Sequence, residues 1–267
     1  MNVATFRRNV WAYYQKHGRH DLPWRPPALK LRRGKENEVI YKILVSEVML
    51  QQTQVERVVP FYTKFLKKFP TAQRLAAAPL STVLKSWQGL GYNRRAKLLR
   101  DAAQSLVDTP PVTTRLNLVK RLKGLPGVGP YTARAVAAFA YNQNVIFVET
   151  NIRTAIIHHF FSKKKKVSDT EIEKILTQAL PKGKARAWYS ALMDYGAYLK
   201  RSGISLNVRS EKYVKQSPFT GSLREARGAI LRAVVTHQSL IPIRKRFPDR
   251  FVKALAALRA EGLVTFR

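Results

Sequence analysis

Two glutamates stand in patterns that suit general acid–base chemistry. Glu47 follows Ile43 by four residues and Leu44 by three, which places its carboxyl group on the apolar face of a helix. Burial favours the protonated form of a carboxyl group, and a protonated carboxyl near neutral pH can act as a general acid. Alternatively, Glu47 lies at the edge of the apolar stripe and reaches a surface lysine, and periodicity alone leaves both interpretations open.

Glu149 precedes an apolar helix predicted from Ile152 to Phe161, with Thr150 or Asn151 expected as its N-cap. The helix dipole favours an ionised carboxylate at this end. Taken alone, Glu149 is better explained as a capping acid than as a catalytic group. Together with Glu47, it forms a pair in which one carboxyl is kept neutral by burial and the other is kept ionised. Such a pair is typical of glycosidic bond cleavage.

A glycine-rich turn at 124–130 joins helices predicted at 113–123 and 131–141. Gly127 and Gly129 allow a tight turn and close approach of another backbone, and Pro130 suits the first helical position. Free N–H groups of the turn and of the following helix would bind a DNA phosphate. The alternative is an ordinary helix connection. A dinucleotide-binding loop is excluded because no strand precedes the turn.

The charge balance indicates an anionic partner. The 267 residues carry 49 Lys and Arg against 16 Asp and Glu, a net charge of +33. Nucleic acid is the first candidate and an anionic membrane the second. No apolar run reaches the ~18 residues of a membrane span, and Met1–Arg8 lacks the apolar core of a signal peptide. We therefore expect a cytoplasmic, nucleoid-associated protein that does not bind membranes.

Metal and disulfide chemistry is restricted by the composition. The chain has no cysteine, which excludes disulfides and cysteine-ligated zinc or iron–sulfur clusters. Its five histidines show no metal-ligand spacing. We expect no cofactor.

Apolar periodicity and proline positions predict helices almost throughout, and no strand-rich segment appears before residue 260, so the fold class is all-α. A charged connection is expected at 28–38, and a β-prone run closes the chain at Leu263–Phe266, which with the last two helices suggests a winged-helix-like unit. Besides the helices named above, we expect helices at about 1–22, 39–53, 55–68, 71–77, 80–87, 93–107, 168–180, 184–200, 222–235 and 248–260.

Several motifs between residues 22 and 200 resemble the helix-hairpin-helix DNA glycosylase superfamily, and most closely the adenine DNA glycosylases of the MutY type. The Ser-Glu-Val-Met-Leu-Gln-Gln-Thr run is the most specific, whereas the hairpin marks only the superfamily. The matching stretches are Leu22–Arg25, Ser46–Gln54, Gly89–Tyr92, Leu125–Gly129 with Tyr131–Ala133, and Asn151–Arg153.

The resemblance implies a two-lobed fold with a cleft between the lobes and a double-stranded DNA substrate that carries a mismatch or lesion. It implies a terminal-helix lobe at 1–28 and 142–210, a six-helix lobe at 29–141 and a basic tail at 211–267. We expect a monomer.

The resemblance also implies residue roles. Glu47 would protonate the adenine ring, Glu149 would stabilise or attack the cationic sugar, and Tyr131 and Asn151 would surround Glu149. Arg25 would line the base pocket, while Gln52 and Tyr92 would enter the DNA stack when the base is extruded. The hairpin at 124–129 is a candidate site for a monovalent cation. Further DNA contacts are expected from Gln51, Leu125, Gly127, Val128 and Gly129.

Superfamily members that also cut the backbone carry a lysine where this chain has Tyr131, and tyrosine cannot form a Schiff base. The expected enzyme is therefore a monofunctional glycosylase. The base is most consistent with adenine opposite G or 8-oxoguanine. Thymine or uracil opposite G, hypoxanthine, and a DNA-binding protein without activity remain alternatives.

This chain departs from the family pattern in four places. Glu149 replaces the usual Asp and adds roughly 1.5 Å of reach, whereas catalytic geometry tolerates about 0.5 Å. The four-cysteine iron–sulfur motif expected after Met193–Ala197 is absent, so residues 198–216 must be held by packing and charge alone. We do not expect the family's 8-oxoguanine recognition domain in residues 211–267, because this stretch is short and has too few predicted strands, which leaves the opposite base open. The connection at 26–38 is longer than usual, which weakens the assignment of Arg25.

Overall fold

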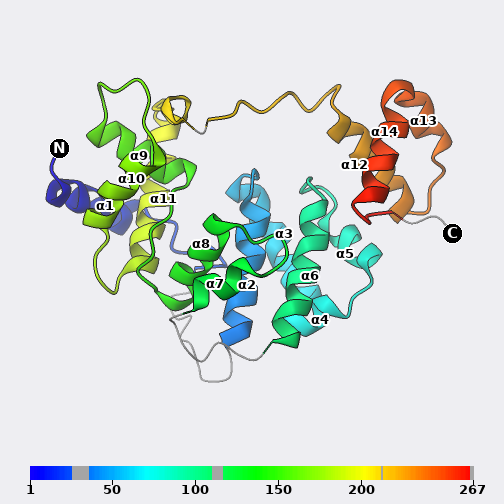
Figure 1. The fold of residues 1–267 in the computed structure, drawn as a ribbon, viewed down its shortest axis with the longest axis horizontal. Helices are drawn as coiled ribbons and strands as arrows, with labels where there is room; N and C mark the ends of the chain where they lie inside the picture. Colours follow the sequence, from blue (N-terminus) through cyan, green and yellow to red (C-terminus); the bar gives the residue numbers. More distant parts are fainter. Residues whose placement is uncertain (26–35, 110–116, 212, 265–267) are drawn as a thin grey trace. The chain divides into compact units, whose positions relative to one another are not determined.

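The computed structural model describes residues 1–25, 36–109, 117–211 and 213–264 (Figure 1). Helices dominate these residues, and their only β-type pairing is an isolated bridge between Val167 and Ser210. The all-α prediction is therefore confirmed. The expectations for 28–35, for the start of the helix at 113–123 and for residues 265–267 lie outside the described residues. No described helix combines the length and the apolar character needed to cross a membrane.

The chain divides into two compact units. The first unit contains Met1–Ile43, Val112–Gly124 and Val128–Lys215. Within it, α11 packs on α9, α1 and α8, and α7 packs on α8. Its helices are α1 (Val3–His17), α7 (Leu118–Lys123), α8 (Pro130–Tyr141), α9 (Thr150–Phe160), α10 (Asp169–Ala179) and α11 (Ala185–Arg201), followed by the short 3₁₀ helix η1 (Asn207–Arg209).

The second unit contains Leu44–Pro111, Leu125–Gly127 and Gln216–Arg267. Here α6 packs on α4 and α5, and α12 packs on α5 and α14. The division from the first unit falls inside α2 (Glu36–Leu50). The other helices are α3 (Val55–Lys68), α4 (Ala72–Ala76), α5 (Leu80–Trp87), α6 (Arg94–Asp108), α12 (Leu223–Val235), α13 (Ile241–Arg246) and α14 (Pro248–Ala260).

The boundaries of these two units differ from those of the predicted lobes. The hairpin helices, expected in the six-helix lobe, belong to the first unit because α8 packs on α11. The tail, expected to stand apart, belongs to the second unit because α12 packs on α5. The assignment of lobes and of a cleft between them stays a prediction.

Most helix bounds follow the predicted ones, and the differences have local causes. The first helix ends at His17 rather than near residue 22, because the backbone at Gly18 turns extended (φ −65°, ψ 144°). The helix α13 was not predicted, because six residues that include Pro242 give no readable periodicity. At α10, the Ser168 and Glu171 side chains form a reciprocal capping box.

The tail contains three helices where two were predicted, α12 to α14. Ile230, Leu231, Phe251 and Leu258 are among its buried side chains. No strand lies among its described residues, which end at Val264. The winged-helix-like arrangement stays a prediction.

Candidate active site

Glu47 lies near the end of α2, and 7% of its surface is exposed. Ile43 and Leu44, on the same face, are fully buried or nearly so, with 2% and 0% exposed. The side chain is therefore withdrawn from solvent, as the buried alternative predicted, and it is not at an exposed edge. A buried carboxyl group resists ionisation, which suits a proton donor.

The end of α2 is held by an arginine that the sequence analysis did not single out. The Arg95 guanidinium, with 9% of the residue exposed, donates through Nη1 to the carbonyl oxygens of Val48 (2.7 Å), Met49 (3.2 Å) and Gln51 (2.6 Å). These carbonyls have no partner inside the helix, so the cation both pairs them and complements the helix dipole. Burial lowers the pKa of Arg95 to about 10, so it remains charged at neutral pH.

The same guanidinium holds the turn at 89–92. Its Nη2 donates to the carbonyl oxygens of Leu90 (3.2 Å) and Gly91 (3.1 Å), and it lies over the rings of Trp87 and Tyr92 at 5.5 Å from each centroid. One side chain therefore joins the two turns that carry Gln52 and Tyr92. Both of these residues adopt the left-handed backbone region, with φ of 56° and 47°, and both are exposed.

Two features of Gly127 in the hairpin exclude other residue types, a left-handed backbone and a close neighbouring side chain. Its φ is +74°, and a β-carbon there would lie 2.8 Å from Cβ of Leu98 on α6. At Gly129, the N-cap of α8, a β-carbon would meet nothing within 4 Å. An external backbone can thus approach the α8 N-terminus. Pro130 follows at the start of the helix, as predicted.

The side chains of Leu125 and Val128 are buried, with 6% and 7% exposed. They anchor the hairpin, so any DNA contact from these positions would come from their backbone. Carbonyl oxygens of this turn are the donor type that a monovalent cation takes, and the cation stays a prediction. Among the described residues, no group of three or more His, Asp or Glu is placed to hold a metal ion.

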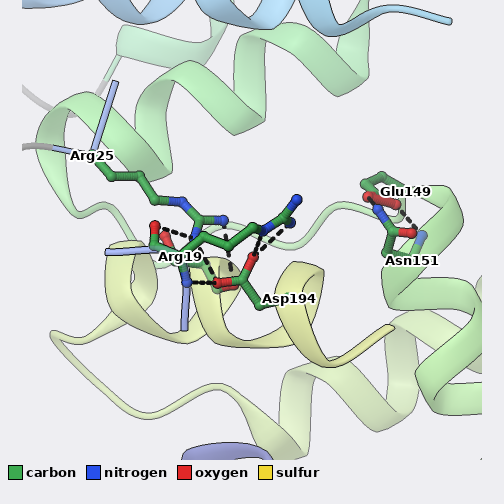
Figure 2. Close-up of polar contacts among 6 residues, drawn as sticks. Arg19, Arg25, Glu149, Asn151 and Asp194 are labelled. Atoms are coloured by element: carbon green, nitrogen blue, oxygen red, sulfur yellow. Dashed lines mark hydrogen bonds and ion pairs between the residues drawn. The ribbon is translucent and has the colours of Figure 1, made fainter. Parts of the chain in front are cut away.

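Glu149 is itself the N-cap of α9, so the prediction of Thr150 or Asn151 as the cap was wrong. Its backbone is extended (φ −127°, ψ 172°), and its carboxylate accepts a hydrogen bond from the backbone N–H of Asn151. The Asn151 side-chain amide donates to the other carboxylate oxygen at 2.6 Å (Figure 2). Asn151 therefore fixes the orientation of the carboxylate with two donors.

Tyr131 on α8 reaches the segment before Glu149 through an aromatic contact. Its ring meets Phe147 edge to face with centroids 5.6 Å apart, and Phe147 stacks on Tyr189 of α11 at 3.9 Å. The Tyr189 hydroxyl donates to the Val145 carbonyl oxygen at 2.7 Å. The apolar run 145–148 is thus clamped between two helices, which sets where Glu149 begins α9.

Arg25 is engaged by a buried carboxylate on α11. Its Nη1 lies 2.7 Å from Oδ2 of Asp194, and Nη2 of Arg19 lies 2.6 Å from Oδ1 (Figure 2). The Asp194 side chain is 2% exposed. Burial alone would raise the pKa of Asp194, but the Arg25 and Arg19 guanidiniums outweigh burial and hold that pKa below its usual value. The structure gives Arg25 a bracing role, and its base-pocket role stays a prediction.

Two further residues of α11 face the start of α9. A β-carbon at Gly196 would lie 2.0 Å from the Asn151 carbonyl oxygen, so only glycine allows this packing. Lys200 follows one turn later. Burial lowers the pKa of Lys200, and the nearby Glu149 carboxylate partly offsets this shift.

Backbone hydrogen bonds hold the loop after α11, so the expectation of packing and charge alone was wrong. The Val167 N–H donates to the Arg209 carbonyl oxygen (2.8 Å), and the Glu211 N–H donates to the Val167 carbonyl oxygen (3.3 Å). The Arg209 side chain also donates to the Ser162 carbonyl oxygen at 2.9 Å. The iron–sulfur cluster implied by the resemblance does not fit this chain, because no cysteine is present to ligate it.

Sequence reasoning missed three residues that hold the predicted site residues in place: Arg95 at the end of α2, Asp194 against Arg25 and Gly196 against Asn151. Met193–Ala197 was noted only as a family marker, although an acid and a glycine inside a predicted helix were visible in it. Arg95 follows the noted Gly89–Tyr92 turn and had no distinguishing signal among 49 basic residues.

Comparisons with known proteins place the chain in a family. Residues 45–182, more than half of the chain, match the HhH-GPD superfamily of base excision DNA repair proteins. The adenine DNA glycosylase of Mycolicibacterium smegmatis is 33% identical over 93% of this chain and 89% of its own length. That of Rattus norvegicus is 41% identical over 57% of this chain, which spans only 29% of the rat protein.

Solved structures agree on the fold. A thermostable thymine-DNA glycosylase matches 78% of this chain and 94% of its own length, with a TM-score of 0.60 and 23% identity. A non-covalent endonuclease III–DNA complex matches 74% of this chain and 87% of its own, with a TM-score of 0.56 and 20% identity. The chain therefore belongs to the HhH-GPD superfamily of base excision DNA repair proteins and is a DNA glycosylase of the MutY type.

Proposed function

We propose that this protein is a monofunctional glycosylase that removes adenine from mismatched double-stranded DNA. In this proposal the base opposite the adenine is G or 8-oxoguanine. The observation that carries the proposal is the buried carboxyl group of Glu47, 7% exposed within α2. It lies in the Ser46–Gln54 run of a chain that shares 33% identity with an adenine DNA glycosylase over most of both lengths.

In the proposed reaction, Glu47 donates its proton to a ring nitrogen of the extruded adenine. The bond between the base and C1′ then breaks, and its electron pair leaves with the base. The sugar is left with a positive charge, which the Glu149 carboxylate stabilises until water adds at C1′ and releases one proton to the solvent. General acid catalysis of this kind contributes about 10²–10⁴-fold.

Glu149 suits the second role because its carboxylate is oriented before substrate arrives. Asn151 donates two hydrogen bonds to it, one from the backbone and one from the side-chain amide. Its longer side chain folds back to cap its own helix, which takes up the extra methylene relative to aspartate. Gly196 and Phe147 fix the backbone on either side.

DNA capture is assigned to the hairpin and to the two turns joined by Arg95. The open space at Gly129 allows a phosphate to approach the α8 N-terminus. Gln52 and Tyr92 would fill the space left by the extruded base, which offsets part of the few kcal/mol that extrusion costs. The net charge of +33 supplies non-specific affinity.

Backbone cleavage is not part of the proposed activity, because Tyr131 has no amine with which to form a Schiff base. Borohydride should therefore trap no covalent complex with DNA. A trapped complex that maps to an active-site lysine would contradict this part of the proposal.

The proposal is tested by single-turnover base release from duplexes that carry A opposite G, 8-oxoguanine, C or T, with Glu47→Gln as control. Release of adenine from the first two duplexes by the wild type, and its loss in the variant, is expected. Duplexes with T or U opposite G serve as the contrast, because pyrimidines lack the ring nitrogen that Glu47 would protonate. Release of thymine or uracil alone would mean that the substrate base is a pyrimidine and not adenine.

A further inference from the structure

The segment from Gln216 to Arg224 contacts both turns that carry the expected DNA-stack residues. Gln216 Nε2 donates to Gln52 Oε1 at 3.0 Å. Arg224 Nη1 donates to the Tyr92 hydroxyl at 2.7 Å, and its guanidinium lies 5.7 Å from the centroid of the Tyr92 ring. These contacts bridge 164 and 132 residues of sequence.

The two residues that are held in this way have strained backbones and exposed side chains. Gln52 and Tyr92 have φ of 56° and 47°, a region that non-glycine residues seldom adopt. Such strain persists only where surrounding contacts impose it. Tyr92 is 38% exposed, so its ring does not gain its orientation from burial in a core.

Arg224 is itself held in place by a hydrogen bond to its own segment and by the packing of its helix. Its Nη2 donates to the carbonyl oxygen of Ser217 at 2.6 Å, and its helix, α12, packs on α5. Arg95 holds the Tyr92 ring from the body of the second unit at 5.5 Å. Two guanidiniums therefore lie near one exposed aromatic ring, each within cation–π range.

The rest of the tail has the charge of a nucleic-acid surface. Residues 216–264 contain nine Lys and Arg against three Asp and Glu. Two of the acids are engaged by tail arginines, Glu225 by Arg246 at 3.2 Å and Glu261 by Arg227. The basic residues Arg232, Arg244, Lys245 and Lys253 are exposed. Such a surface fits DNA backbone phosphates.

We propose that Arg224 is a positioning residue that holds Tyr92 ready to enter the DNA stack, and that Gln216 does the same for Gln52. The tail thereby becomes part of the DNA-insertion machinery, with its basic residues on the flanking backbone. This inference rests on the proposed function, because the insertion role of the two turn residues belongs to it.

The test uses the full-length protein and a duplex with the fluorescent base 2-aminopurine next to the mismatched adenine, so that insertion is read as unstacking. The variant Arg224→Ala is compared with Arg232→Ala, which removes an exposed charge elsewhere on α12. Each variant removes one positive charge from the tail, so both should weaken binding and make it less steeply dependent on salt. Only Arg224→Ala should reduce the fluorescence change and lower the saturating single-turnover rate by about tenfold.

Two further variants separate charge from positioning. Arg224→Lys keeps the charge without the planar guanidinium, so it should restore affinity without restoring insertion. In a Tyr92→Ala background, Arg224→Ala should cost no more than Arg232→Ala, because its target is gone. Should Arg224→Ala fail to fold, Gln216→Ala is compared with the exposed Gln238→Ala for the same fluorescence change.

The inference is overturned when Arg224→Ala behaves like Arg232→Ala, or when it speeds insertion, since the contact would then mask Tyr92. An undiminished effect in the Tyr92→Ala background would also overturn it. Failure of the proposed function looks different: the wild type would release no adenine, while binding and fluorescence could still be compared among the variants.

Discussion

The two glutamates to which we assign the reaction lie in different units and hold their carboxyl groups in opposite ways. Glu47 lies in the body of a helix among apolar side chains and is 7% exposed. Glu149 stands at the start of a helix, where a backbone N–H and a side-chain amide both donate to it. The first region buries its carboxyl group, whereas the second orients it with two hydrogen-bond donors. The same residue type is thus suited to deliver a proton in one place and to carry charge in the other.

The largest effect is expected at the buried carboxyl group of Glu47. Glu47→Gln keeps size and polarity but carries no transferable proton, so single-turnover adenine release should fall by about 10²–10⁴-fold. The dissociation constant for mismatched duplex should change little. Full release in this variant would remove Glu47 from the chemistry and end the contrast between the two regions.

A structural carboxylate in the first unit provides a reference for stability. Asp194→Asn removes the charge that Arg19 and Arg25 share in a buried site, which should cost about 3–5 kcal/mol of unfolding free energy. Urea denaturation of both proteins measures this difference.

The pH dependence of that difference has a defined sign. The folded pKa of Asp194 is depressed, so its stabilisation is fully present above the unfolded value of about 3.9 and is lost as pH falls through the lower folded pKa. The wild type and Asp194→Asn should therefore converge in stability only in strongly acidic solution. Convergence near neutral pH would contradict the ion pairing.

Shortening the oriented carboxyl tests how far the geometry depends on glutamate. Aspartate is a strong N-cap, so Glu149→Asp should keep the folded stability. Because the carboxylate moves by roughly 1.5 Å, base release should fall by about 10²-fold. Equal activity of the two proteins would show that the position tolerates either reach. Glu149→Gln, which keeps the length without the charge, is the matched control.

The smallest expected effect is electrostatic and concerns Lys200. Burial lowers the pKa of Lys200, and the Glu149 carboxylate opposes part of that shift. Removing the charge with Glu149→Gln should therefore lower the pKa of Lys200 further. Acetylation of Lys200, followed by mass spectrometry across a pH series, should set in at lower pH in the variant. An unchanged profile would mean that the two groups do not interact.

Periodicity and turn chemistry predicted most of the helices, because these depend on neighbours within one or two turns, whereas for Glu47 they left a buried and an edge position open. They also placed Pro130 at the start of α8. The long-range contacts that hold the predicted site residues in place could not be predicted in this way. Asp194 pairs with Arg19 across 175 residues, and Gly196 is required only because the Asn151 carbonyl oxygen lies against it. A single sequence contains no signal for such long-range pairs.

The prediction of the N-cap of α9 was wrong for a different reason. The residues preferred at an N-cap include Thr and Asn but not Glu, so the sequence favours Thr150 and Asn151. Here the extended backbone at Glu149 lets its longer side chain return to the Asn151 N–H.

Arg95 has a consequence for how the second unit opens. A single guanidinium donates hydrogen bonds to the carbonyl oxygens at the end of α2 and in the turn at 89–92. Neither turn can detach without leaving that buried cation short of partners, so the two should open together as one cooperative segment. Amide hydrogens around Gln52 and around Tyr92 should then exchange with similar protection, although some 40 residues separate them in the chain.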